Sequence, residues 1–293
     1  MVPKLGVVTP VVHVNPRWDP PGWEETGSLE DVLAIAVAAD RAGFDWMACS
    51  EHIAVPLEAH AMRGGRYWDP FTTLAVISTV TERTRLLTHM AVLSYHHPLE
   101  LVKRLGTLDL VSKGRVVLGV GVGSLEPELG HRFEGRGERA DDALRAIRAA
   151  WGNKVPEYSG THFRFGGLVV DPSGLPRPLE VWVGGRTVRS LRRAAELGDA
   201  WMPFRLTLDE LRTLLARTAV RSILDSRDRP LGFIFAPEPP IDPLGRPAET
   251  VDFLRAYLDI GATGFSLRFR QYSPTHFVEQ LEATMAIAPQ LSH

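Results

Sequence analysis

Cysteine is almost absent from this sequence, because Cys49 is the only one among 293 residues. A lone cysteine excludes a framework of disulfides within the chain and is typical of proteins from a reducing compartment. A surplus of charge is absent too. The formal net charge is −2, whereas a protein that binds nucleic acid usually presents a strongly basic face. We therefore expect no nucleic-acid partner.

Long apolar runs are absent as well. No window reaches the roughly 18 uncharged apolar residues that a membrane-spanning helix needs. The first residues carry one lysine, and Pro3 and Pro10 interrupt their apolar run, which is unlike a signal peptide. We therefore expect a cytoplasmic protein with no membrane partner.

Several catalytic signatures are also missing. The ten histidines include no H-E-x-x-H spacing, so we predict no metal site. There is no G-x-S-x-G elbow, and Cys49 lies within a predicted strand rather than at the start of a helix. Hydrolysis through a covalent intermediate therefore has little support.

Short β-branched runs alternate with helical patterns along the whole chain. Eight strand–helix pairs over this length are typical of a (β/α)8 TIM barrel, and an open doubly wound sheet is the structural alternative. Residues 155–174 interrupt the alternation, and their glycines predict a β-hairpin inserted after the fourth helix. We expect one domain over residues 1–293, with strands at residues 5–10, 44–52, 85–93, 115–123, 179–185, 200–204, 231–239 and 264–269. Between the sixth and seventh strands, we expect one helix over residues 207–224.

Both folds bind ligands at the carboxyl ends of their strands, so the residues at these ends are the candidate site. The second strand ends in Glu51 and His52. An imidazole there can donate a proton or bind a cofactor near neutral pH. The alternative is a histidine at the barrel rim that pairs with its neighbouring carboxylate.

Two glycine-containing strand ends follow. Gly121, Val122 and Gly123 belong to a G-x-G-x-G run, which differs from the G-x-G-x-x-G fingerprint of dinucleotide-binding proteins. Their bare backbone suits either the close approach of a planar ligand or tight packing. The run from Gly184 to Thr187, with Arg186 in it, leads into a helix, and free helix amides beside an arginine favour a phosphate.

The order of these motifs resembles the luciferase-like oxidoreductases that use a flavin or the deazaflavin coenzyme F420. The matching pieces cover roughly residues 5–205: SEH, DPFTTLAVISTVTERTRLLT, YHHPLELVKRLGTLDLVSKGRVVLGVGVG, GERADDALRAIRAAW, YSGTHFRF, LEVWVGG and AAELGDAWMP. The combination of SKGRVVLGVGVG and WVGG in one sequence is specific to this family, whereas no single piece is.

The resemblance implies a TIM barrel whose cofactor ring lies at the carboxyl-end mouth, supported by a non-prolyl cis peptide near the end of the third strand. It implies catalytic roles for His52 and Glu51. It also implies a cofactor site made of His52, Thr88, His89, Met90, Gly121, Val122, Gly123, Gly184, Gly185, Arg186 and Thr187. One departure is Ser124, which stands where the deazaflavin sugar-phosphate dehydrogenases of the family have a glutamate, with Glu126 two residues later. A sugar-phosphate substrate is therefore in doubt.

We expect a coenzyme F420-dependent oxidoreductase that transfers a hydride between the deazaflavin ring and a small organic substrate, in a homodimer. The alternative is an FMN-dependent monooxygenase that uses O2 and reduced flavin from a separate flavin reductase. A second alternative is a barrel that binds no redox cofactor. In the first two cases the ring does the chemistry and the protein supplies position and electrostatics.

Overall fold

Parallel strands close into a barrel in the computed structural model, which describes residues 2–14, 22–123 and 134–292. The strand order is β3-β2-β1-β11-β10-β9-β8-β5-β4, and a further pairing of β3 with β5 closes the ring. The predicted TIM barrel is therefore confirmed, and the open sheet is wrong. The strands are β1 (Lys4–Val8), β2 (Trp46–Cys49), β3 (Arg85–Thr88), β4 (Ala91–Val92), β5 (Val116–Gly121), β8 (Val181–Gly184), β9 (Ala200–Met202), β10 (Gly232–Phe235) and β11 (Gly264–Leu267).

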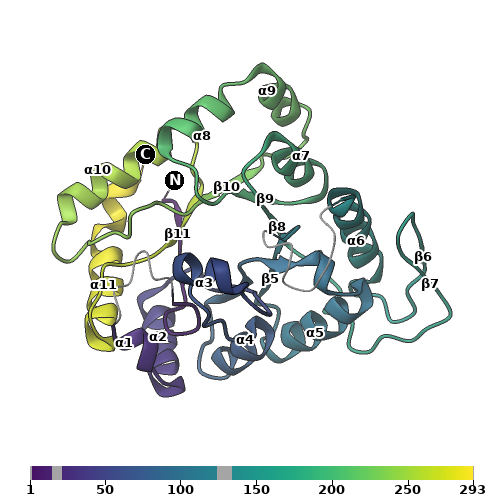
Figure 1. Ribbon diagram of the computed structural model, residues 1–293, viewed down its shortest axis with the longest axis horizontal. Helices are drawn as coiled ribbons and strands as arrows, with labels where there is room; N and C mark the ends of the chain where they lie inside the picture. The colour runs from purple at the N-terminus through teal and green to yellow at the C-terminus, as the bar shows by residue number, and fades with distance from the viewer. Residues whose placement is uncertain (1, 15–21, 124–133, 293) are drawn as a thin grey trace.

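Helices surround the barrel on its outer side (Figure 1). The long helices bury one face against the barrel, as in α2, where Val32, Ile35, Ala36 and Ala39 are buried. The helices are α1 (Trp23–Thr26), α2 (Leu29–Ala42), α3 (Leu57–Arg63), α4 (Pro70–Ser78), α5 (Pro98–Val111), α6 (Arg136–Ala150), α7 (Val188–Leu197), α8 (Leu208–Leu215), α9 (Thr218–Asp225), α10 (Pro247–Leu258) and α11 (Pro274–Ile287), with short 3-10 turns at Leu93–Tyr95 and Ala288–Leu291. No helix among the described residues has the length and apolar character to cross a bilayer.

One predicted helix, over residues 207–224, is divided into α8 and α9. Leu211 and Leu214 are buried, and a continuous helix would next turn the polar Thr218 and Ser222 toward the core. The break at Arg217, whose backbone is extended, changes the phase so that Val220 is buried instead. The apolar spacing therefore explains why one helix becomes two.

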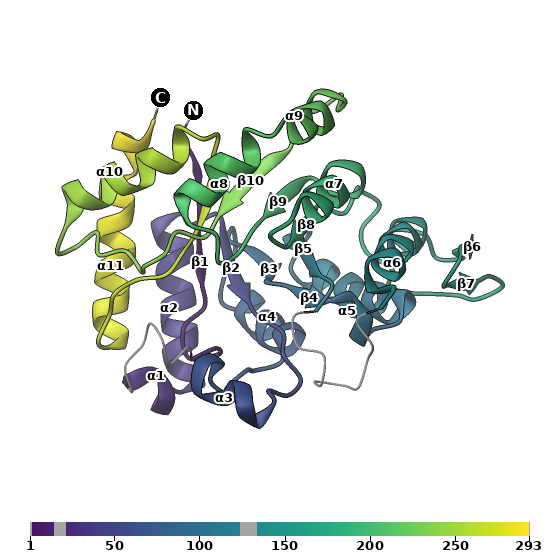
Figure 2. The same ribbon diagram turned by 45° about the horizontal axis from the view of Figure 1, so that its top comes forward.

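The inserted segment between α6 and β8 contains a two-stranded antiparallel sheet of β6 (Tyr158–Ser159) and β7 (Arg164–Phe165). It lies at the side of the barrel, next to α6, in both views (Figures 1 and 2). The buried carboxylate of Asp142 in α6 holds it, accepting hydrogen bonds from the Tyr158 hydroxyl and from the backbone amides of His162 and Phe163. Asp142 thus supplies the hydrogen bonds between α6 and the segment, and Arg139 of the same helix lies over the Phe163 ring.

Aromatic side chains fill the barrel near the amino ends of the strands. The rings of Trp46 and Trp182 meet edge to face at 4.8 Å, and a Cβ at Gly6 would lie 2.0 Å from the Trp46 ring. The guanidinium of Arg85 lies over both rings and pairs with Glu180 at 2.8 Å. This packing leaves the opposite, carboxyl end of the barrel for a ligand.

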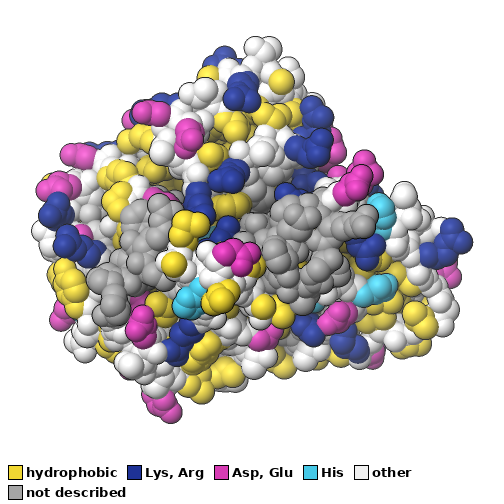
Figure 3. Space-filling view, in the orientation of Figure 1, with side chains coloured by type: hydrophobic (Ala, Val, Ile, Leu, Met, Phe, Trp, Pro, Cys, Tyr) yellow, Lys and Arg dark blue, Asp and Glu magenta, His cyan; other side chains and the backbone are white. Residues whose placement is uncertain are grey.

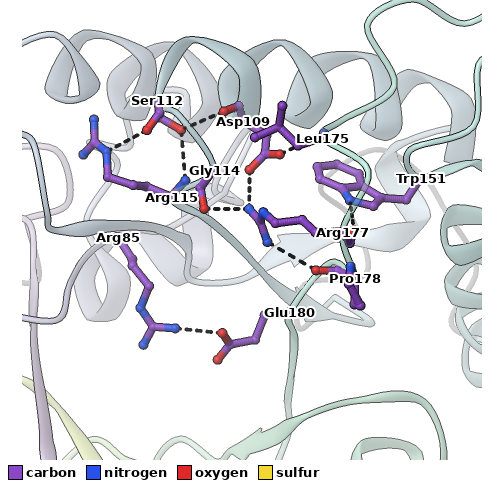
Figure 4. Close-up of polar contacts among 10 residues, drawn as sticks. All are labelled: Arg85, Asp109, Ser112, Gly114, Arg115, Trp151, Leu175, Arg177, Pro178 and Glu180. Carbon is purple, nitrogen blue, oxygen red and sulfur yellow. Dashed lines mark hydrogen bonds and ion pairs between the residues drawn. The ribbon is translucent and has the colours of Figure 1, made fainter.

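Polar contacts at the same amino end join the loops before β5 and β8 (Figure 4). Arg177 donates to the buried carboxylate of Asp109 and to the carbonyl of Gly114, and Asp109 also accepts from the amide of Leu175. The Trp151 indole donates to the Arg177 carbonyl at 3.0 Å. These contacts secure the end of the barrel that lies away from the candidate site, so we assign them to stability.

The third strand of the barrel changes register along its length. It runs as β3 to Thr88, continues through His89 and Met90, and resumes as β4. The peptide between His89 and Met90 is cis, near the end of the third strand, where the family resemblance implies such a bond. Three residues of this strand lie opposite two of β5, as in a β-bulge. The hydroxyl of Thr88 fills the gap by donating to the Gly119 carbonyl and accepting from its amide. The pairs on either side are Leu86 with Val116, Leu87 with Val117, Ala91 with Val120 and Val92 with Gly121.

Candidate active site

A cavity of about 1250 Å³ opens at the carboxyl ends of the strands. Figure 3 looks onto this face, where dark-blue Lys and Arg side chains gather near the middle and beside α7. Eleven of the twelve residues that the sequence predicts for the site line the cavity, namely Glu51, His52, His89, Met90, Gly121, Val122, Gly123, Gly184, Gly185, Arg186 and Thr187.

Thr88 is the predicted residue that lies apart from the cavity. Its side chain is buried, and both hydrogen-bonding functions of its hydroxyl are used by Gly119. Thr88 therefore joins two strands of the barrel, and the prediction that it binds the cofactor has no support in its contacts. The carboxylates of Glu126 and Glu128 lie outside the described residues.

The carboxylate of Glu51 is directed to the protein rather than to the cavity. It accepts a hydrogen bond from the amide of Val92 at 2.6 Å and lies 2.8 Å from Nε2 of the buried His96. Both partners follow the register change of the third strand. Glu51 thus positions that segment, whereas the catalytic role predicted for it would need a carboxylate that faces the ligand.

His52 lies half-buried at the end of β2, with its ring 4.6 Å from the ring of Tyr67 in an edge contact. Tyr67 in turn stacks on the ring of His13, with their centroids 4.5 Å apart. The loops after β1 and β2 thereby bring two histidines and a tyrosine to one side of the cavity. His52 keeps its place as the candidate proton donor or acceptor, since it lines the cavity next to these groups.

The glycines of β5 and β8 make room for Met90. A Cβ at Gly184 would lie 2.9 Å from Cγ of Met90, and a Cβ at Gly121 would lie 3.3 Å from its Cβ. Close packing, which was one of the two explanations for the bare backbone, therefore accounts for these two glycines. The side chain of Met90 forms part of the cavity wall as a result.

The turn into α7 is preorganised by a capping box. The Thr187 hydroxyl accepts from the amide of Ser190, and the Ser190 hydroxyl accepts from the amide of Thr187. Gly185 has φ +125°, and a Cβ there would lie 2.6 Å from Ser190. Arg186 is exposed, with its guanidinium 5.7 Å from the centre of the Phe204 ring. The predicted phosphate-binding residues thus lie together at the start of a helix.

Arginines gather along this side of the cavity. Arg189, Arg192 and Arg193 recur three and four residues apart, so they share the face of α7 that borders the cavity. Arg193 pairs with Asp141 and donates to the Gly137 carbonyl, which holds the start of α6. We call the set the basic arm; it consists of Arg136, Arg186, Arg189, Arg192, Arg193 and Arg205.

Sequence reasoning missed His13 and Arg268. Nδ1 of His13, after β1, accepts a hydrogen bond from Arg268, after β11, at 3.0 Å. Burial, and then the positive charge of Arg268, holds the pKa of His13 well below 6.5, its ordinary value. The strand-end rule that selected His52 also applies to His13 and Arg268, because Arg268 directly follows β11 and His13 lies in the loop after β1.

His89 is the second histidine with a depressed pKa. Burial, followed by the charge of Arg268, lowers the pKa of His89 to about 4. Its Nδ1 is buried and has no hydrogen-bond partner among the residues that the structure describes. A buried ring nitrogen without a partner at a cavity wall is a point at which a bound ligand can complete the hydrogen bonding. Within the described ranges, no group of three His, Cys, Asp or Glu side chains is placed to hold a metal ion.

Comparison with known proteins gives a family match over most of the chain. The family described as luciferase-like monooxygenase matches residues 11–234. An uncharacterized protein of Mycobacterium tuberculosis is 32% identical over 195 residues, which cover 60% of this chain and 69% of that protein. The F420-dependent hydroxymycolic acid dehydrogenase of the same organism is 27% identical over 195 residues, covering 64% of this chain and 52% of the dehydrogenase.

A solved structure also has the same fold. It is the oxygenating constituent of 3,6-diketocamphane monooxygenase from Pseudomonas putida, a type II Baeyer–Villiger monooxygenase in complex with FMN. The TM-score is 0.72 at 16% identity, and the alignment covers 98% of each chain. At this identity the likeness concerns the fold alone.

Proposed function

We propose that this chain, which belongs to the luciferase-like monooxygenase family, is a coenzyme F420-dependent oxidoreductase that acts on a small organic substrate. The basic arm is the observation that carries the choice of cofactor. Arg186, Arg189 and Arg192 are exposed along it and form none of the ion pairs found among the described residues. These charges suit a ligand with several negative groups.

The two candidate cofactors differ mainly in their tails. FMN ends in one phosphate, whereas coenzyme F420 continues from its phosphate into a chain of glutamate carboxylates. One phosphate needs only the capped start of α7 and Arg186, whereas the basic arm extends further along α7, to Arg192. The similarity to a dehydrogenase named as F420-dependent also favours the deazaflavin.

The described residues fit a planar ring at the mouth of the barrel. Met90, Gly121 and Val122 offer an apolar wall, and the unpartnered Nδ1 of His89 offers a hydrogen bond. When bound, coenzyme F420 supplies the hydride chemistry. The protein binds and orients the reactants, and His52 takes or gives the proton that accompanies oxidation or reduction of the substrate.

The second candidate function is that of an FMN-dependent monooxygenase. The FMN complex with the same fold favours it, as does the capped helix start, which suits a single phosphate. Such an enzyme needs reduced flavin, so a flavin reductase would be its partner. A homodimer is proposed for both functions, and light scattering of the purified protein would test it.

Fluorescence titration of the purified full chain with coenzyme F420 and with FMN tests the proposal. We expect F420 to bind more tightly, and Arg186→Ala to weaken its binding at least about tenfold, because a charged contact is lost. Arg221→Ala, which removes an exposed arginine of α9, is the matched control and should leave the affinity unchanged.

The other outcomes discriminate between the candidates. Tighter binding of FMN, with loss of F420 preference, would contradict the proposal and favour the monooxygenase. Binding of neither ring would remove the redox function and leave a barrel that binds some other ligand.

A further inference from the structure

Arg268 lies half-buried at the cavity without an acidic partner among the described residues. Its hydrogen-bond acceptor is Nδ1 of His13, at 3.0 Å. A guanidinium can only donate, so Nδ1 of His13 accepts and the ring proton resides on Nε2. The histidine therefore orients the arginine without neutralising its charge.

The two histidine rings beside Arg268 carry no charge that could neutralise it. His89 is a second neutral neighbour, because the charge of Arg268 helps to lower its pKa to about 4. The Tyr67 ring covers the other side of the contact by stacking on His13. Among the nearby carboxylates that line the cavity, Glu51 is committed to Val92 and His96, and Glu238, which follows β10, forms no ion pair with Arg268. A partly buried cation without an ion-pair partner is costly unless a ligand brings the counter-charge.

Arg268 is also separated from the basic arm. It follows β11, which lies between β1 and β10, whereas the basic arm starts at β8. In a ring of eight strand positions, the side of β1 and β11 faces the side of β5 and β8. Met90 and the glycines occupy that opposite side. The cavity thus has two cationic regions, one along α7 and one at Arg268.

We propose that Arg268, held by His13, is the receptor for an oxyanion of the substrate, so that the substrate class is that of small organic anions such as carboxylates. This inference rests on the proposed function in one respect, which is that the bound anion is the substrate of the oxidoreductase. The anion site itself is defined by residues outside the basic arm. Arg268 binds the anion through its forked donors, His13 positions it, and His52 lies on the same side as the group that moves a proton.

Calorimetric titration of the F420-loaded protein with formate, acetate and benzoate tests the proposal. Benzamide is the neutral control for benzoate, and inorganic phosphate shows whether another oxyanion competes. We expect at least one carboxylate to bind, and Arg268→Gln to weaken its binding at least about tenfold. Arg270→Gln removes the same charge from an exposed residue of the same strand end and should leave the affinity unchanged.

A second readout follows the histidines. Because the charge of Arg268 lowers the pKa of His13 and of His89, a bound anion should raise both values in the wild-type protein, as measured by NMR titration of the imidazole rings. In Arg268→Gln the pKa of each ring should already be higher, and the anion should have no further effect. A merely structural arginine would give no response to the anion.

The results separate this inference from the proposed function. If no carboxylate or phosphate binds more tightly to the wild type than to Arg268→Gln, the inference is wrong. It is also wrong if Arg268→Gln loses affinity for F420 instead of for the anions. If neither F420 nor FMN binds, the anions are titrated into the protein without cofactor. Anion binding that depends on Arg268 would then support the anion site, although the proposed redox function would be wrong.

Discussion

At the scale of single residues, His89 shows how burial sets the response of this protein to pH. Its pKa is about 4 in the folded chain, against 6.5 for an ordinary histidine, because burial and then Arg268 disfavour the charged ring. Between these two pH values the unfolded chain binds a proton that the folded chain does not bind. Stability therefore falls as the pH falls from 6.5 toward 4.

His89→Gln should reduce this dependence on pH. A histidine that titrates only in the unfolded state changes the free energy of unfolding by up to about 1.4 kcal/mol per pH unit. Urea unfolding at about pH 7 and about pH 5 should show a smaller difference for His89→Gln than for the wild type, with part of it retained because the pKa of His13 is lowered as well. His60→Gln, at an exposed histidine, is the control. If the free energy of unfolding changed equally between the two pH values in the wild type and in His89→Gln, His89 would not be a source of the pH dependence.

Two residues that act as a pair on neighbouring strands are also those that sequence reasoning did not find. His52 and the run from Gly184 to Thr187 could be predicted because each carries its signal within a few neighbouring letters. His13 and Arg268 are 255 positions apart, and they meet only because β1 pairs with β11. A lone histidine after the first strand has no local pattern that distinguishes it from a surface residue.

At the scale of elements, the segment with β6 and β7 depends on Asp142 of α6. The carboxylate accepts hydrogen bonds at 2.5 Å from the Tyr158 hydroxyl and at 2.7 Å and 3.0 Å from the amides of His162 and Phe163. Burial alone would raise the pKa of Asp142, but these hydrogen bonds outweigh it and lower the pKa below its ordinary value. The ionised carboxylate is thus the form that holds the segment.

Asp142→Ala should release the two-stranded segment from α6. Two backbone amides and a hydroxyl lose their acceptor, which should lower the free energy of unfolding by about 2–4 kcal/mol. Hydrogen exchange should increase over residues 158–165 and change little in the barrel strands. Asp252→Ala, an exposed carboxylate of α10, should cost less than about 0.5 kcal/mol. Unchanged exchange over the segment would mean that its own packing holds it.

The boundaries of elements were harder to predict than their order. The run from residue 85 to 93 looks like one strand, but Thr88, His89 and Met90 interrupt its ladder with β5. The predicted helix over residues 207–224 likewise divides at Arg217. For the strand the local sequence is compatible with a continuous element, whereas for the helix the apolar spacing changes phase at Arg217. The interruption follows from which side chains must face the core or the cavity, which depends on distant neighbours.

At the scale of the whole molecule, the closure of the barrel involves the seam between the third strand and β5. The backbone pairing there consists of two residue pairs before Thr88, Leu86 with Val116 and Leu87 with Val117, and two more in β4. The Thr88 hydroxyl extends the seam through its two hydrogen bonds with Gly119, at 2.8 Å and 3.0 Å. The side chain of Thr88 therefore helps to close the barrel that the eight strand–helix pairs predict.

Thr88→Val should weaken this joint while keeping the shape of the side chain. The buried amide and carbonyl of Gly119 lose their partner, and we expect a loss of about 1–3 kcal/mol in the free energy of unfolding. Urea unfolding measures it, with Thr107→Val at an exposed position of α5 as the control. A loss no larger than that of the control would show that the hydroxyl is dispensable for closure.

The register change in the third strand has a consequence for how this protein could acquire a new specificity. Side chains alternate between the two faces of a strand, so one additional residue exchanges the faces of everything after it. Leu87 faces the barrel interior, and after the additional residue Met90 and Val92 take that side, while Ala91 and Leu93 pack in the outer core. Deleting a single codon there would present Ala91 and Leu93 to the ligand, a larger alteration of the wall than any one amino-acid replacement can make.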